Sequence, residues 1–253
     1  MPARPARHRL LSGSCSSARS FDPRFLPTLG RPRAVALHFA RCDQLATGLT
    51  PVRVRPCWAH KLPTLLQKRR FPAQLLARLN SDSGSPLRGK IRTPTTPSGI
   101  VQDNSILKML ENSLSDGLLY RYRDPETNQS DVESMLQIVK SFWKAASIVF
   151  PKAWGLPPAK SRLMHGAGIV SMGYLMDAIG ERFRDAKIPH EEQFRHDLLP
   201  LVDVCRWTDG YWDFGPGVKR KWNEVQNTPK DIQMLANYLM VQYKALVWSR
   251  PQS

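Results

Sequence analysis

Apolar residues recur at helical spacing through the second half of the chain, and this pattern predicts a mainly α-helical fold. The clearest stretch begins at Ser130 and ends at Pro151. Glu133 follows Ser130 by three residues, which predicts a capping box at the start of the helix. One broad apolar face follows, made of Val132, Met135, Leu136, Val139, Phe142, Trp143, Ala146 and Val149. We expect this helix to lie in the core.

Further helices are predicted where the same spacing recurs between turn-forming residues. Asp103 is a good N-cap for one of them and Gly117 a stop signal, and Thr228 followed by Pro229 marks the start of the last. The predicted ranges are Gln74–Asn80, Asp103–Ser115, Lys160–Asp185, Pro189–Val204 and Pro229–Trp248.

Two segments interrupt the helical pattern. Residues 86–99 contain three Pro and two Gly, which predicts an extended or looped segment. Asp209-Gly210 lies between aromatic residues, which predicts the tight turn of a β-hairpin. Residues 71–253 are therefore expected to form one helical bundle with a small hairpin.

Three glycines recur every seven residues in the predicted helix Lys160–Asp185, namely Gly166, Gly173 and Gly180. A glycine inside a helix costs about 1 kcal/mol relative to Ala. Three on one stripe therefore favour the close approach of another backbone or of a ligand. An otherwise ordinary helix that is broken at Gly166–Gly168 explains the pattern equally well. If the close approach is real, this face is a candidate contact with a second copy of the chain or with another protein.

The front of the chain differs from the rest in composition. Residues 1–60 contain ten Arg and two Asp but neither Lys nor Glu, whereas 23 basic residues meet 19 acidic ones from Phe71 onward. Residues 1–70 lack apolar periodicity, so we expect a basic and mostly disordered segment. Three interpretations stay open: a targeting presequence, a basic arm that binds nucleic acid, or a segment produced by a wrong start codon or reading frame. We favour the last because residues 1–60 contain neither Lys nor Glu.

Cysteine spacing and hydropathy restrict the compartment and the cofactors. Cys15, Cys42 and Cys57 lie in the front segment and leave Cys205 alone in the patterned part. Zinc sites use closely spaced cysteine pairs, and the sequence has none. It therefore predicts no metal, no cofactor and a reducing, cytoplasmic location. No apolar stretch reaches the roughly 20 residues that span a bilayer, so no membrane association is expected.

No set of residues typical of catalysis stands out, and we interpret the chain as non-enzymatic. His165 lies in an apolar segment, where a packed and hydrogen-bonded histidine is expected rather than a catalytic base. Six carboxylates lie near arginines on predicted helix surfaces, where we expect solvated side chains with weak ion pairs. They are Glu181, Asp185, Glu191, Glu192, Asp197 and Asp203.

Two short basic clusters are candidate contacts for nucleic acid, because cations beside aromatic rings suit phosphates and bases. Two solvated surface patches explain the same clusters equally well. The first cluster is Arg88, Lys90 and Arg92, and the second is Lys219, Arg220 and Lys221 with the adjacent Trp222.

Four stretches of residues 71–253 resemble a known family. They are Leu76–Ile91 (LARLNSDSGSPLRGKI), Ile106–Tyr120 (ILKMLENSLSDGLLY), Lys160–Asp177 (KSRLMHGAGIVSMGYLMD) and Gln226–Tyr238 (QNTPKDIQMLANY). In these stretches the chain resembles the C-terminal part of the DGQHR-domain proteins. That family contains relatives of DndB from bacterial DNA-modification systems and is distantly related to ParB-type domains. The Asp-Gly-Gln-His-Arg motif is absent, so the chain resembles a truncated member that retains the helical half.

The resemblance implies a bacterial, non-catalytic helical module that associates with DNA. No family site can be carried over to a residue here, because the motif that would carry it is missing. The alternative is a protein-interaction or oligomerisation module without nucleic-acid binding. Its contact surface would be formed by the glycine face and by apolar helix faces.

Overall fold

The chain divides into two units, Met1–Pro56 and Cys57–Ser253. The computed structural model describes residues 64–123, 130–183 and 188–248, all within the second unit. The prediction of a disordered front segment concerns mainly residues outside this described part. Its boundary at residue 70 is corrected, because helix α1 begins at Thr64 and the helical domain includes residues 64–70.

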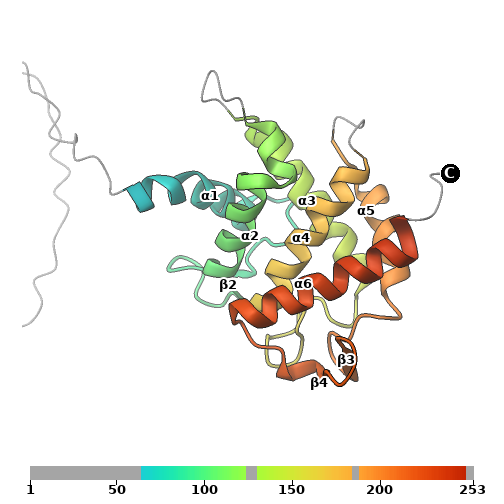
Figure 1. Cartoon of the computed structure of the whole chain (residues 1–253). Helices are drawn as coiled ribbons and strands as arrows, with labels where there is room; N and C mark the ends of the chain where they lie inside the picture. Colours follow the sequence, from blue (N-terminus) through green and yellow to red (C-terminus); the bar gives the residue numbers. More distant parts are fainter. Residues whose placement is uncertain (1–63, 124–129, 184–187, 249–253) are drawn as a thin grey trace, which may run out of the picture. The chain divides into compact units, whose positions relative to one another are not determined.

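The described residues are mainly helical, which confirms the predicted fold class (Figure 1). The α-helices are α1 (Thr64–Ser81), α2 (Asp103–Asp116), α3 (Val132–Val149), α4 (Gly166–Arg182), α5 (Glu191–Leu198) and α6 (Pro229–Tyr243). Short 3-10 turns follow at η1 (Leu118–Tyr122), η2 (Leu199–Leu201) and η3 (Trp222–Glu224), and a π-helical turn, η4 (Lys244–Trp248), continues α6. Strands β1 (Ile91–Arg92) and β2 (Val101–Gln102) pair in parallel, and β3 (Tyr211–Asp213) and β4 (Lys219–Lys221) pair antiparallel.

Helix α4 is the central helix of the domain. It packs against both α2 and α6, and Figure 1 shows α6 crossing in front of it. Ile169, Met172, Met176 and Ile179 are fully buried. The segment 163–176 contains no Asp, Glu, Lys or Arg, so neighbouring elements can cover every side of the helix.

Helix α3 is a core helix, as its apolar face predicts. Phe142 and Trp143 are fully buried. Phe142 meets Phe194 of α5 edge to face, with ring centroids 5.4 Å apart, and this contact joins the two helices. The helix begins one residue later than expected, because Asp131 is the N-cap and its Oδ1 accepts from the Ser134 N–H at 3.0 Å. The capping box predicted from Ser130 and Glu133 is therefore wrong.

The hairpin exists, but the predicted position of its turn is wrong. Asp209-Gly210 precedes β3, and the chain reverses between Phe214 and Val218 instead. Gly215 and Gly217 have φ of 122° and 74°, in the region that favours glycine. Gly210 closes the other end of the hairpin, where its carbonyl accepts from the Trp222 N–H at 3.0 Å.

None of the helices in the described part of the chain combines the length and the apolar character that a bilayer-spanning segment requires.

Candidate functional site

The β3–β4 hairpin places the second basic cluster on two different faces. Tyr211 lies opposite Lys221, and Asp213 lies opposite Lys219. Side chains alternate along a strand, so these four share the outer face. Trp212, on the inner face, is fully buried. The outer face is open: Tyr211 is 64% exposed, and the ammonium group of Lys219 lies 3.6 Å from the Asp213 carboxylate.

Arg220 is on the inner face and has a structural role. Its Nη1 donates to Asp231 Oδ1 at 2.9 Å, and the other oxygen of Asp231 accepts from the Gln226 N–H at 2.8 Å. Asp231 is buried in the first turn of α6, so this ion pair fixes the hairpin to that helix. Because this ion pair occupies its guanidinium group, Arg220 is a weaker candidate for a phosphate contact than Lys219 and Lys221.

Trp222 is also occupied within the fold. The guanidinium group of the buried Arg162 lies 5.9 Å from the centroid of its ring, a cation–π arrangement. Arg162 also donates to the carbonyls of Pro158 and Asn223. Trp222 is only partly buried, so its ring helps to hold the base of the hairpin and is a poorer candidate for stacking than Tyr211.

The first basic cluster lies in the loop around β1, apart from the hairpin (Figure 1). Asn80 holds this loop, because its side chain bonds both the N–H and the carbonyl of Ile91 at 3.1 Å. Arg92 is exposed, but its Nε donates to the Gly99 carbonyl at 2.9 Å. Lys90 is partly buried and Arg88 is exposed. The loop thus presents single cations instead of a continuous basic surface.

The glycine face of α4 is a close-packing surface inside the domain. Gly166, Gly173 and Gly180 are all buried. A Cβ atom at Gly173 would clash with Met109 of α2, and one at Gly180 would clash with Leu118. At Gly166 it would lie 2.6 Å from the Asn227 side chain. The expected contact with a partner through this face is therefore corrected, because the chain's own residues cover it.

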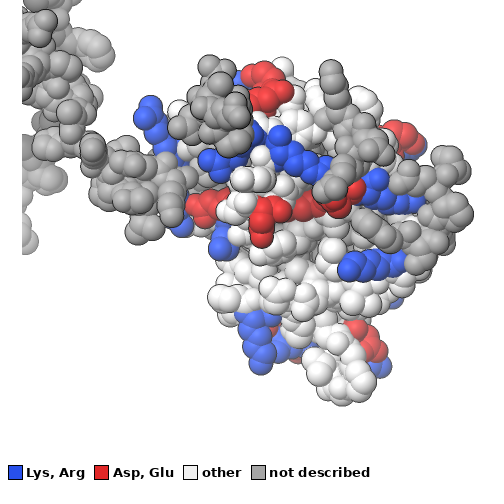
Figure 2. Space-filling view, turned by 45° about the horizontal axis from the view of Figure 1, so that its top comes forward, with Lys and Arg blue, Asp and Glu red and all other residues white. Residues whose placement is uncertain are grey.

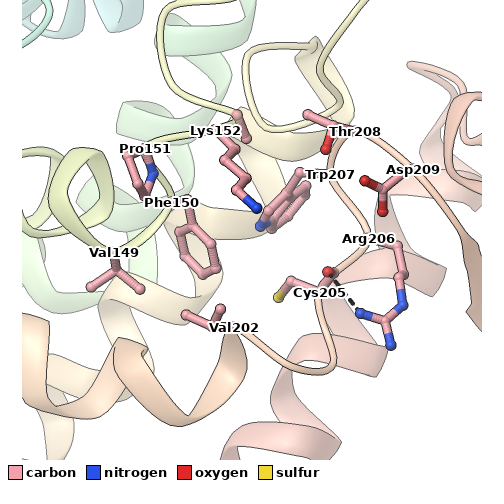
Figure 3. A pocket seen from close by; sticks show the side chains of 11 residues that line it. Val149, Phe150, Pro151, Lys152, Val202, Cys205, Arg206, Trp207, Thr208 and Asp209 are labelled. Carbon is pink, nitrogen blue, oxygen red and sulfur yellow. Dashed lines mark hydrogen bonds between the residues drawn. The ribbon is translucent and has the colours of Figure 1, made fainter.

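A pocket of about 360 Å³ opens between the end of α3 and the segment that follows η2 (Figure 3). Its apolar wall includes Phe150 and Trp207, whose rings meet edge to face at 6.0 Å. Lys152, Arg206 and Asp209 supply its charged groups. The sequence does not predict this pocket, because its two halves are about 50 residues apart and neither carries a motif.

The thiol of Cys205 also lines the pocket, but it is not an activated nucleophile. Burial raises the pKa of this thiol, so it stays protonated at neutral pH. Among the described residues, no three His, Cys, Asp or Glu side chains are grouped so that they could hold a metal ion.

The prediction of a solvated Asp197 is wrong. Asp197 is fully buried and accepts from Arg182 Nη1 at 2.6 Å and from the Tyr243 hydroxyl at 2.7 Å. Burial and this carboxylate raise the pKa of Tyr243 well above its usual range. The group joins α4, α5 and α6. The spacing of Asp197 from Phe194 and Leu198, which places it on the apolar face of α5, was the signal that could have identified it.

The other carboxylates of that set differ from Asp197. Glu181 pairs with Arg121, and Glu192 pairs with Arg195 at 2.5 Å, both on the surface. Glu191 is partly buried and Asp203 is exposed, while Asp185 lies outside the described residues.

His165 is a packed residue with a capping role. It is the N-cap of α4, and its Nδ1 accepts from the Ala167 N–H at 3.4 Å. Burial, with a smaller effect of the nearby Arg162 cation, lowers the pKa of His165 to about 4. The imidazole is therefore neutral at physiological pH and can accept this hydrogen bond.

Comparison of the chain with protein-family models, with curated proteins and with solved structures finds no match.

Proposed function

We propose that the described domain is a non-catalytic, DNA-associated module that contacts nucleic acid through the outer face of the β3–β4 hairpin. The observation that carries the proposal is the exposed Tyr211 ring, which lies opposite Lys221 with Lys219 on the same face. Aromatic rings stack on bases, and lysines neutralise phosphates. The resemblance to DGQHR-domain proteins of bacterial DNA-modification systems supports the same reading.

The expected interaction is local and weak. From Phe71 onward the 23 basic and 19 acidic residues nearly balance. Figure 2 shows basic and acidic side chains interspersed over one face of the domain, with no continuous basic surface. Asp213 also lies on the outer face of the hairpin, beside Lys219. A strand would therefore be held by a few contacts, and salt should weaken it readily.

The first prediction tests the hairpin by fluorescence anisotropy with labelled single-stranded and duplex DNA across a salt series. We expect the double substitution Lys219→Ala and Lys221→Ala to reduce the slope of log affinity against log salt by about 1.5, because two phosphate contacts are lost. Tyr211→Ala should weaken binding to the single strand about tenfold with an unchanged slope, because it removes stacking and no charge.

The control removes the same charge elsewhere. Lys108→Ala with Lys144→Ala changes two exposed lysines on α2 and α3, and its slope should equal that of the parent. Each protein is measured as the full chain and as residues 57–253, the second unit. If only the full chain binds, the affinity belongs to the Arg-rich front segment and the hairpin proposal fails.

A second candidate function is a protein-interaction module, and a groove beside α6 favours it. The groove measures about 640 Å³ and its wall is mostly apolar. Met234, Tyr238 and Val241 of α6 line it together with Phe214 of the hairpin. Val241 is 62% exposed, so part of this apolar wall meets solvent. If neither the full chain nor residues 57–253 shows salt-dependent binding to DNA, the result favours the protein-interaction function over the DNA-associated one.

A further inference from the structure

We propose that the pocket between α3 and the segment after η2 binds a small organic anion. The apolar body of the ligand lies against Phe150 and Trp207, and its carboxylate or phosphate group contacts the ammonium group of Lys152. This inference does not rest on the hairpin's role, because the pocket shares no residue with the outer face of the hairpin.

The dimensions and the wall fit a small molecule. A volume of about 360 Å³ lies within the range of known ligand pockets, roughly 300–1,000 Å³. Phe150 and Trp207 are almost fully buried and pack edge to face, so this side of the pocket is rigid. Val202 lines the opening and is 39% exposed. A ligand would cover the exposed part of Val202 and the small part of the two rings that still meets water.

The charges of the pocket select an anion. Lys152 follows the end of α3 directly after Pro151, and its side chain is exposed. Arg206 makes one long hydrogen bond, from Nη1 to the Cys205 carbonyl at 3.4 Å. Figure 3 shows Lys152 and Arg206 on two sides of Trp207. Asp209 is the single carboxylate of the lining, so two cations meet one anion, and an anionic ligand gains charge-assisted hydrogen bonds.

The test is isothermal titration calorimetry of the full chain with three probes, without nucleic acid. Phenyl phosphate carries both parts of the ligand, inorganic phosphate carries the charge alone, and phenol carries the ring alone. We expect phenyl phosphate to bind at least tenfold more tightly than either of the others. Equal affinity for phenyl phosphate and inorganic phosphate, or no binding of phenyl phosphate, overturns the proposal.

Substitutions then locate the site. Lys152→Ala removes an exposed side chain and should weaken phenyl phosphate about tenfold, the usual effect of losing a hydrogen bond to a charged group. Val202→Phe should reduce the affinity by filling the opening. Lys144→Ala removes an exposed lysine from α3 outside this pocket and should leave the affinity unchanged. Unchanged binding by both pocket variants shows that the anion binds elsewhere, and the proposal is then wrong.

Discussion

Gly173 lacks a side chain because Met109 of α2 occupies the place where a Cβ atom would lie. Both residues are buried, and the atom in contact is Cγ of Met109, near the backbone end of that side chain. Gly117 is explained in the same way. Its φ of −100° is open to any residue, but the Asp177 carboxylate lies where its Cβ would be. In both cases glycine serves a close approach and not an unusual backbone conformation.

The contact between Gly173 and Met109 can be tested by substitution. We expect Gly173→Ala to lower the free energy of unfolding by about 1–3 kcal/mol, because overpacking outweighs the gain of about 1 kcal/mol in helix propensity. Met109→Ala alone should also destabilise by leaving a cavity. The double variant should lose less than the sum of the two, since the added methyl enters space that Met109 vacates. Urea unfolding measures all three proteins, and strict additivity would show that the two residues do not compete for space.

The burial of Asp197 could not be predicted from its residue type. Charged residues are mostly exposed, and that rule placed all six carboxylates of the set on the surface. Asp197 is buried because Arg182 and Tyr243, from two other helices, supply the hydrogen bonds that its carboxylate loses on leaving water. These partners lie 15 and 46 residues away in the sequence, so no local pattern identifies them.

Among the elements, apolar periodicity located the helices, whereas the local rules for helix ends held at α6 and failed at α1 and α3. The apolar residues that recur at helical spacing in α3, α4 and α6 are largely the residues that these helices bury. Thr228 caps α6 as expected, with Oγ1 accepting from the Asp231 N–H at 3.2 Å. The sequence predicts a short helix at Gln74–Asn80, and proline inside a helix is usually disruptive. In the structure α1 continues through Pro72 back to Thr64.

The element-scale prediction concerns the attachment of the hairpin to α6. Asp231→Ala should lower the free energy of unfolding by about 1–3 kcal/mol, because it removes the partner of Arg220 and leaves the Gln226 N–H without its acceptor. Asp231→Asn keeps an oxygen acceptor and should lose less.

The matched control for that prediction is Asp213→Asn, an exposed carboxylate on the outer face of the same hairpin. Its distance of 3.6 Å to Lys219 in solvent predicts a change below about 0.5 kcal/mol. Denaturant unfolding compares the three variants. Equal stability of Asp231→Ala and the parent would contradict a structural role for the Arg220–Asp231 pair.

For the whole molecule, the sequence predicts the mainly helical fold class. It predicts only some residues of the hairpin site and none of the pocket. The sequence predicts Lys219 and Lys221 as nucleic-acid contacts because they belong to a basic run that adjoins Trp222, and this stays a prediction. The sequence does not predict Tyr211 as part of this site. Tyr211 lies opposite Lys221 only in the observed strand register, and a turn at Asp209-Gly210 would give a different register. The anion pocket requires the end of α3 to meet the segment after η2, and only tertiary packing brings these together.

His165, the N-cap of α4, and Asp177, within α4, should change the free energy of unfolding in opposite directions as pH rises. Burial and Arg162 lower the pKa of His165 to about 4 from 6.5, so between these values the unfolded chain binds more protons and stability rises with pH. Asp177 has the opposite sign. Burial raises its pKa to about 6 from 3.8, with hydrogen bonds from Ser113 and the Leu118 N–H opposing the shift, so between these values stability falls as pH rises.

Substituting Asp177 and His165 one at a time separates their contributions to the pH dependence of stability. Asp177→Asn removes the contribution that falls with pH, so its free energy of unfolding should rise more steeply than that of the parent between pH 4 and 6. His165→Asn supplies an oxygen acceptor at the N-cap of α4 in place of the imidazole Nδ1 and removes the contribution that rises with pH. Its slope should therefore be smaller than that of the parent or negative. Carboxylates common to all the proteins, such as Asp82 and Asp131, cancel in this comparison. The measurement is guanidinium chloride unfolding at pH 4.5, 5.5 and 6.5. Parallel curves for the three proteins would show that neither residue changes its proton affinity on folding.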